Sequence, residues 1–146
     1  MSQPATPSGL PGYGLSLNLE DAKRVVAAAE AEARANGWAM VIAVVDAGAN
    51  LVALQRMDDA NIGSLAVAQS KAETAVKFRR STKLFEDQIV AGGVGLRVLS
   101  MREICAVEGG LPIVVDGRVV GGVGVSGAQA TQDAQVAAAG AAVLAR

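Results

Sequence analysis

Hydrophobic residues change their spacing several times along this chain, and each change marks an expected element. After Asn18 they recur every three or four positions up to Gly37, which predicts an amphipathic helix capped by Asn18 and ended by Gly37. Two β-rich runs follow at residues 39–46 and 50–57, and residues 46–50 between and at the ends of these runs are of types typical of turns. The first half of the chain is therefore expected to form a helix and then a hairpin.

The middle of the chain returns to a helical pattern. Residues 62–77 are rich in small side chains, which would let this helix pack closely on a sheet. A shorter helix is expected at residues 81–90, and the glycines within 91–101 indicate a loop. Residues 104–107 are apolar and predict a short strand.

The last third of the chain predicts a second hairpin and a final helix. Valine-rich runs at residues 111–115 and 118–126 flank Asp116 and Gly117, the residue types that a type I′ turn requires because both central positions need positive φ. The alanine-dominated segment after residue 130 indicates the final helix. The two valine-rich runs are therefore predicted to pair as antiparallel strands.

Together these segments predict an α+β fold, with the order helix, two strands, two helices, three strands and a helix. Strands that are neighbours in sequence and joined by tight turns make an antiparallel sheet, here of about five strands flanked by helices. We expect residues 17–146 to form a single domain. Residues 1–16 are expected to be a flexible tail or an arm that docks on a neighbour.

The last predicted strand has one face that is almost bare backbone. Alternation along the strand places four residues on that face: Val120, Gly122, Gly124 and Ser126. In one interpretation a small-residue helix, the final one containing Gly140, packs directly on this face. In the other, the bare face and the turn at Gly109 and Gly110 line a pocket for a flat or anionic ligand.

Composition narrows the class of protein. Of 146 residues, 51% are hydrophobic and only 3% aromatic, and so much apolar surface on a small domain favours a homo-oligomer. A formal charge of −1 without a basic run argues against nucleic-acid binding. The chain lacks an apolar stretch of membrane-spanning length and a signal-peptide pattern, so we expect a cytoplasmic protein without a membrane partner.

The sequence contains no histidine. This excludes Ser-His-Asp and Cys-His catalysis, and it removes the commonest protein ligand of metals and of haem iron. Cys105 is the single cysteine, so an intrachain disulfide is impossible and a zinc site lacks its usual ligands. No metal site is therefore expected.

Three motifs carry a resemblance to a known family. "VVDAGANLVALQRMDDA", "SKAETA" and "GGLPIVVDGRVVGGVGVSGA", in this order, resemble the GlcG/HbpS-like family of haem-degrading or haem-binding domains, which is related to the C-terminal domain of PduO. The resemblance extends from Leu17 to Leu144. It implies an antiparallel sheet flanked by helices, compact homo-oligomers that are commonly octamers, and binding of haem or another small molecule in some members.

Haem-binding relatives use a histidine as an iron ligand, and this sequence departs from that pattern. In principle five other side chains could replace it: Cys105, Met57, Met101, Tyr13 and Lys71. Each of them is also a common core or surface residue. A haem propionate or another carboxylate could be held by Arg56 or Lys71.

Several residues are candidates for a ligand site. Arg56 follows a predicted strand and could reach an anionic ligand or form an ion pair with Asp58 or Asp59. Lys71 and Thr74 share one side of a predicted helix by their spacing of three residues, and they belong to the "SKAETA" motif. Ser126 at a strand end could bond a ligand or cap the next segment.

Glu108 is the candidate catalytic residue. It directly precedes Gly109 and Gly110, where an apolar, glycine-lined setting would raise the pKa of its carboxyl group toward the range that suits a general acid or base. Its alternative role is an exposed turn residue.

Two classes of function remain from the sequence. The first is a homo-oligomeric binding protein whose ligand is a small organic acid or a tetrapyrrole such as haem. The second is a cofactor-free lyase or isomerase in which Glu108 transfers a proton and Arg56 or Lys71 holds a substrate carboxylate. The missing histidine favours a small organic ligand over haem degradation.

Overall fold

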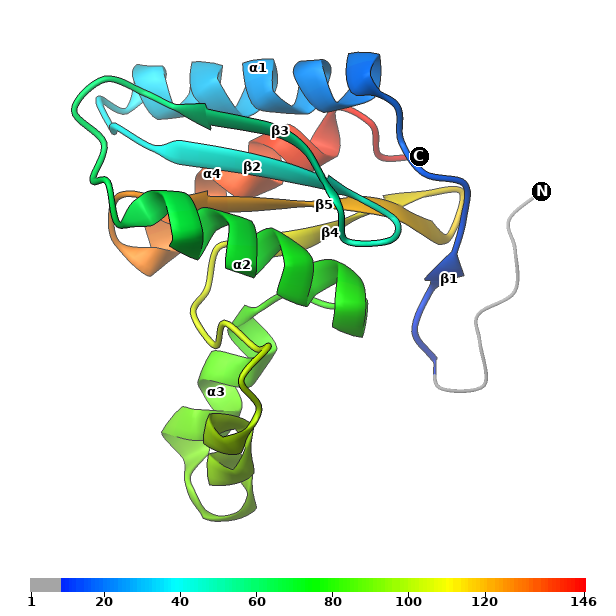
Figure 1. Ribbon diagram of the computed structural model, residues 1–146, viewed down its shortest axis with the longest axis vertical. Coiled ribbons are helices and arrows are strands. Elements are labelled where there is room, and N and C mark those ends of the chain that lie inside the picture. Colours follow the sequence, from blue (N-terminus) through cyan, green and yellow to red (C-terminus); the bar gives the residue numbers. More distant parts are fainter. Residues whose placement is uncertain (1–8) are drawn as a thin grey trace.

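The computed structural model describes residues 9–146, and a five-stranded, largely antiparallel sheet forms its centre (Figure 1). The first eight residues of the expected tail lie outside the described residues. In chain order the elements are β1 (Gly12–Tyr13), α1 (Leu19–Ala35), β2 (Val41–Asp46), β3 (Leu51–Arg56), α2 (Ser64–Phe78), α3 (Lys83–Ala91), the 3₁₀ helix η1 (Gly93–Ser100), β4 (Gly110–Val115), β5 (Arg118–Ser126) and α4 (Ala130–Ala142).

The sheet is organised around β5, the longest strand. Its two antiparallel neighbours are β2 and β4, and β3 pairs with the other edge of β2. The short β1 runs parallel to the start of β5 through Gly12 and Tyr13. The turn between β4 and β5 has the predicted geometry, because Asp116 and Gly117 have φ values of 51° and 75°.

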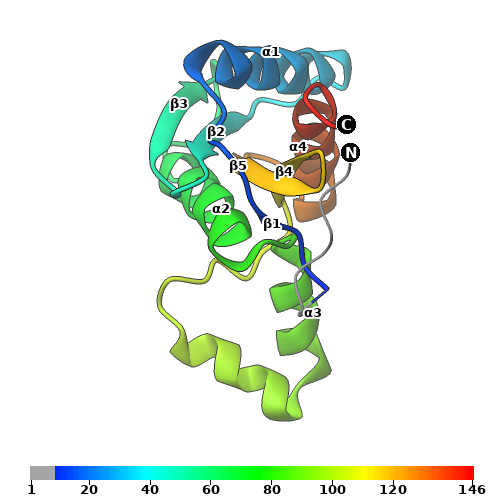
Figure 2. The same cartoon turned by 90° about the vertical axis from the view of Figure 1, so that its right-hand side faces the viewer.

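Helices cover both faces of the sheet (Figure 2). On one face α1 and α4 lie side by side and bury the larger apolar cluster, which includes Val25, Ile42 and Val136. On the other face α2 lies alone over a smaller cluster of alanines and valines from β2 and α2 itself. The core is thus two thin apolar layers separated by the sheet.

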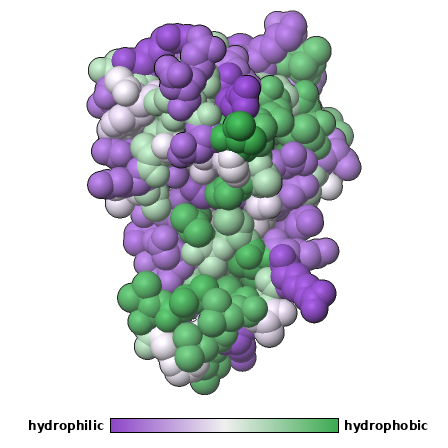
Figure 3. Space-filling model, turned by 60° about the vertical axis from the view of Figure 1, so that its left-hand side comes forward, coloured by the Kyte–Doolittle hydropathy of each residue, from purple (hydrophilic) through white to green (hydrophobic). Residues whose placement is uncertain are grey.

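One part of the molecule stands apart from this layered body. Residues 83–100, which form α3 and η1, project from one end and are here called the arm (Figures 1 and 2). Five apolar side chains of the arm are exposed: Leu84, Val90, Val94, Leu96 and Leu99. Figure 3 shows the end of the molecule that carries the arm as a continuous hydrophobic surface.

The α+β class and the order of the main elements are confirmed, and three details differ from the sequence prediction. Residues 104–107 form no strand, because the backbone N–H of Cys105 donates to the Thr74 hydroxyl on α2 instead of to a neighbouring strand. The fifth strand is β1, within the expected tail. Between residues 91 and 101, where a loop was expected, the chain forms η1.

Candidate functional site

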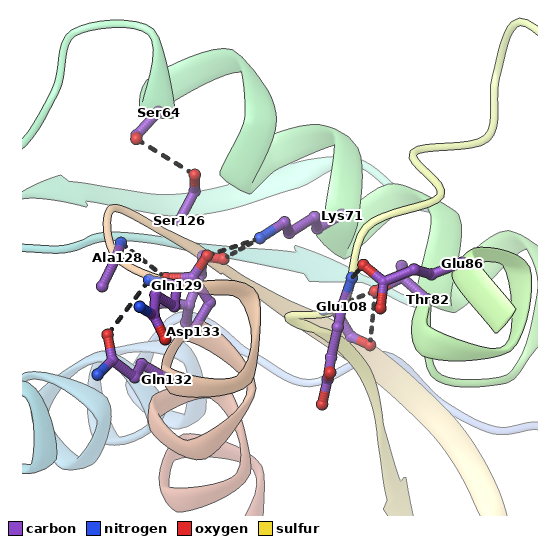
Figure 4. A network of polar contacts seen from close by, with 12 residues as sticks. Ser64, Lys71, Thr82, Glu86, Glu108, Ser126, Ala128, Gln129, Gln132 and Asp133 are labelled. Atoms are coloured by element: carbon purple, nitrogen blue, oxygen red, sulfur yellow. Dashed lines mark hydrogen bonds and ion pairs between the residues drawn. The ribbon is translucent and has the colours of Figure 1, made fainter. Parts of the chain in front are cut away.

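Lys71 lies in the middle of α2 with only 1% of its surface exposed. Its Nζ donates to Asp133 Oδ2 at 3.0 Å and to the carbonyl oxygen of Val125 at 2.8 Å (Figure 4). A buried ammonium group is tolerated only when it is paired and hydrogen-bonded, and both conditions are met here. The Lys71 ammonium is therefore already paired within the protein, and a ligand carboxylate would have to displace Asp133 to bind it.

Asp133 connects three elements at the end of the sheet. Its Oδ2 accepts the bond from Lys71, and its Oδ1 accepts one from the backbone N–H of Ala128 at 3.0 Å, just before α4. The pair thus ties α2 and α4 together across the end of β5, as Figure 4 shows. Sequence reasoning missed Asp133, although a lone acidic residue in an alanine-rich helix is the signal that could have revealed it.

The glycines at 109 and 110 make room for α2. A Cβ atom on Gly109 would lie 2.7 Å from Lys71 Nζ, and its φ of +130° is one that other residues rarely adopt. A Cβ atom on Gly110 would collide with the carbonyl oxygen of Lys71. The N–H of Gly110 donates to the buried hydroxyl of Thr82 at 2.9 Å, a second partner that the sequence did not reveal.

Thr74 holds the segment before this turn on the surface of α2. Its hydroxyl donates to the carbonyl oxygen of Ser70 at 2.7 Å and accepts the N–H of Cys105 at 3.0 Å. Burial raises the pKa of the Cys105 thiol, an effect that the positive charge of Lys71 and a hydrogen bond from the backbone of Val107 oppose. The thiol is thus protonated at neutral pH.

The bare face of β5 is occupied by a helix. Cβ atoms on Gly122 and Gly124 would contact Val76 and the backbone of Ala68 in α2, so these glycines let the helix backbone approach the strand. The helix is α2, whereas the sequence pointed to the final helix. Ser126, at the end of the same face, is buried and donates to the Ser64 hydroxyl at 3.2 Å.

The remaining sequence candidates do not converge. Glu108 is half-buried, its N–H donates to Glu86 Oε1 at 3.4 Å, and its side chain points away from Lys71 in Figure 4. Arg56 is exposed at the end of β3, and the order β3-β2-β5-β4 places it three strands, or roughly 14 Å, from Gly110. Arg56, Lys71 and Glu108 therefore do not share a pocket.

An open cleft lies against the outer surface of α2, next to Cys105. Its volume is about 440 Å³, within the range of small-molecule sites. Five residues of α2 and four residues from the segment that follows η1 line it. The lining residues are Ala66, Val67, Ser70, Glu73, Lys77, Arg102, Glu103, Ile104 and Cys105.

The side chains of residues 9–146 offer few ligands for an iron centre. No group of three or more carboxylates and thiols is placed to hold a bare metal ion in this part of the chain. Of the five side chains considered for haem iron, Lys71 is bonded to Asp133, and the Tyr13 hydroxyl donates to the carbonyl oxygen of Val76 at 2.7 Å. Of the five, Cys105 is the one that lines the cleft described above, and its thiol would have to lose a proton before it could bind iron.

None of the helices within residues 9–146 is both long and apolar enough to cross a membrane.

Known proteins share both the sequence and the fold. Protein GlcG of Escherichia coli K12 is 44% identical over 110 residues, which cover 75% of this chain and 81% of GlcG. The crystal structure of a double mutant of HbpS from Streptomyces reticuli has a TM-score of 0.83 at 31% identity and covers the whole of this chain and 99% of its own. The structure of a PduOC:heme complex has a TM-score of 0.79 at 28% identity, over 88% of this chain and 94% of that one.

A family model described as "Haem degrading protein HbpS-like" matches residues 17–142. This match spans every element from α1 to α4, including the buried pair of Lys71 and Asp133. The chain therefore belongs to the HbpS-like family.

Proposed function

We propose that this protein is a homo-oligomeric binding protein of the bacterial cytoplasm, and that its ligand is a tetrapyrrole or a small organic acid bound in the cleft beside Cys105. The observation that carries the proposal is the position of this thiol at the wall of a cleft of about 440 Å³. The relative solved as a heme complex supports the tetrapyrrole, and the similarity to GlcG of Escherichia coli supports a bacterial protein.

The cleft combines the chemical groups that such a ligand needs. Val67 and Ile104 offer apolar contact, the Ser70 hydroxyl offers a hydrogen bond, and Lys77 and Arg102 offer cations for a carboxylate or propionate. Haem iron would be held by Cys105, whose thiol must lose a proton on binding. Haem, when bound, would bring its redox and ligand-binding chemistry to this cleft.

Proton transfer by Glu108 is not part of the proposal. The Lys71 ammonium is already paired with Asp133, and Arg56 lies three strands away, so neither is placed to anchor a substrate carboxylate beside Glu108. The geometry thus supports binding more directly than catalysis.

Because Cys105 is the sole cysteine, it is also a reporter of its own cleft. Haemin titrated into the apo-protein should give a saturable Soret change at a fixed ratio per subunit. Bound haemin should also slow alkylation of the thiol by iodoacetamide. In Cys105→Ser the Soret spectrum should change and the affinity should fall, because a hydroxyl is a much weaker iron ligand than a thiolate.

Titration of haemin into buffer alone and into an unrelated cysteine-containing protein controls for non-specific haemin adsorption. Saturation that is unchanged in Cys105→Ser, with no protection of the thiol, would remove haem from this cleft. Failure of haemin to saturate would exclude the tetrapyrrole, and small carboxylates would then be screened by the same protection of Cys105. If none of these compounds protects the thiol, the binding site proposed here is wrong.

The arm supports the oligomeric part of the proposal. Val90 and Leu99 are 80% and 68% exposed, and isolated small domains seldom leave a projecting apolar surface in water. We propose that copies of this chain cover one another's arms. An octamer, as the family resemblance implies, is the assembly expected.

A further inference from the structure

A second cleft lies at the end of the sheet opposite the arm. It forms where the segment before α1, the β4–β5 turn and the last residues of the chain meet (Figure 1). Its volume is about 610 Å³, and it shares no lining residue with the cleft beside Cys105. It is therefore a separate site in position and composition.

Part of the lining of this second cleft is apolar. Leu17, Val120 and Leu144 line it, and Leu17 and Val120 also pack against the main core, which fixes their positions. Leu15 lines the cleft as well and is 93% exposed. An apolar ligand surface would cover Leu15 and the partly exposed Val120 and Leu144, which is favourable in proportion to the area covered.

The rim of the cleft carries cations from separate parts of the chain. Arg24 of α1 donates to the carbonyl oxygen of Val143 at 3.3 Å and lies 4.0 Å from the carboxylate of Asp21. Arg146 lies 3.4 Å from Asp116. Asp21 and Asp116 also line the cleft, so an incoming anion competes with them for the two guanidinium groups. A guanidinium has five N–H donors, so these few and mostly long contacts leave donors of both groups for an additional acceptor.

Arg118 contributes a third guanidinium in a fixed position. It is half-buried, and it donates to the carbonyl oxygen of Tyr13 at 3.0 Å, which holds β1 beside β5. This guanidinium is thus held in the wall of the cleft. Guanidinium groups next to apolar side chains favour an anion that has an apolar body.

We propose that this cleft binds a small amphipathic monocarboxylate, with its apolar chain on Leu17 and Val120 and its carboxylate between Arg24 and Arg146. Guanidinium groups match the geometry of carboxylates and bind them through charge-assisted hydrogen bonds. The inference does not depend on the function proposed for the cleft beside Cys105.

Sodium hexanoate is the probe, and amide NMR spectra of the complete protein are the readout. Signals of residues around the cleft should shift saturably with hexanoate. Hexanamide, which has the same chain without the charge, should bind about tenfold more weakly or worse, a loss that corresponds to one charge-assisted contact. Added salt should weaken hexanoate binding, because these rim groups are exposed.

The variant Arg24→Gln with Arg146→Gln should lose hexanoate binding by a similar factor. Arg34→Gln is the matched control, because Arg34 is an exposed arginine at the opposite end of the same helix. Cys105 alkylation should be unaffected by hexanoate, which separates this site from the other cleft. If the double variant fails to fold, the comparison of hexanoate with hexanamide on the unmodified protein decides.

Three results would overturn the inference. Equal binding of hexanamide and hexanoate would show that the guanidinium groups play no part. An equal loss in Arg34→Gln would show a general charge effect, and shifts without saturation would show that there is no site.

Discussion

The buried ion pair between Lys71 and Asp133 shows what a local sequence motif can and cannot indicate about a single residue. The spacing of the "SKAETA" motif placed Lys71 and Thr74 on one helix side, and both are indeed buried together. The partner of Lys71, however, lies 62 residues further along the chain. No local pattern predicts such a pairing, because only the packing of α2 against α4 brings the two groups together.

Lys71→Met should lower the free energy of unfolding by about 3–5 kcal/mol, because it leaves the Asp133 carboxylate buried without its cation. Adding Asp133→Asn should recover part of this loss, since the amide carries no charge and can still accept the N–H of Ala128. Urea unfolding of the variants measures both effects. Lys77→Met, on the exposed side of the same helix, should cost less than about 1 kcal/mol and serves as the control.

Equal losses from Lys71→Met alone and together with Asp133→Asn would contradict the pairing. Such a result would mean that the packing of the Lys71 stem, and not its charge, stabilises α2.

Cys105 gives a prediction that depends on pH. Because burial raises the pKa of its thiol, the folded protein holds this proton to a higher pH than the unfolded chain does. The pH midpoint of iodoacetamide alkylation should therefore be higher for the folded protein than for the protein in urea. A midpoint equal to or below that of the unfolded chain would show that Lys71 and the Val107 N–H outweigh burial.

The same shift has a consequence for stability. A proton held more tightly in the folded state stabilises it below the thiol pKa of the unfolded chain, about 8.5, and this contribution is lost as pH rises through the folded pKa. Cys105→Ala should therefore lose less stability than the unmodified protein above about pH 8.5. Parallel urea titrations at neutral and alkaline pH measure the difference.

At the scale of elements, the sequence predicted the strands and helices well because their signals are local. Asn18 caps α1 as expected, and Asp116 with Gly117 forms the expected turn. The strand predicted at residues 104–107 was wrong, because an apolar run does not determine a strand partner. Here the Thr74 hydroxyl accepts the N–H of Cys105 that a strand would use for pairing. For the bare face of β5, the interpretation that a helix covers it is correct, but the helix is α2.

Gly124→Ala tests whether the bare face of β5 serves to pack α2 closely or to line a ligand pocket. A Cβ atom there would collide with the carbonyl oxygen of Ala68, so α2 must shift and the protein should lose about 1–3 kcal/mol of stability or more. Gly63→Ala, where no atom lies within 4 Å of the added methyl group, is the matched control and should be nearly neutral. Thermal and urea unfolding measure both.

A variant Gly124→Ala that keeps full stability but loses ligand binding would instead show that the face lines a pocket. It would contradict the close packing of α2 on β5.

At the scale of the whole molecule, the arm is the feature that the sequence did not reveal. Its helical segment was predicted, but periodicity within α3 cannot tell whether an apolar side chain faces the protein's own core or another copy. In the folded chain Phe85 and Val98 are buried, while their neighbours Val90 and Leu99 remain in water. The high apolar content pointed to an oligomer, and the arm shows where the unsatisfied apolar surface is located.

Two lysines placed on the arm should therefore break the assembly without unfolding the subunit. Val90→Lys with Leu99→Lys adds charges at exposed positions, where substitutions cost a folded monomer little, but burying these charges in an interface would cost several kcal/mol. Light scattering after size-exclusion chromatography should show a smaller mass than for the unmodified protein. Leu19→Glu, at an exposed apolar position on α1 far from the arm in sequence, should keep the original mass.

If the double arm variant keeps both its mass and its unfolding midpoint, the arm is not an interface between subunits. If haemin binding is lost together with the assembly while the isolated subunit remains folded, the ligand site requires a neighbouring copy. Retained binding in the smaller species would place the whole site within one chain. The segment that carries Cys105 follows the arm directly at Met101, so the structure of one chain does not show whether assembly and ligand binding are linked. The arm variant tests the two properties separately.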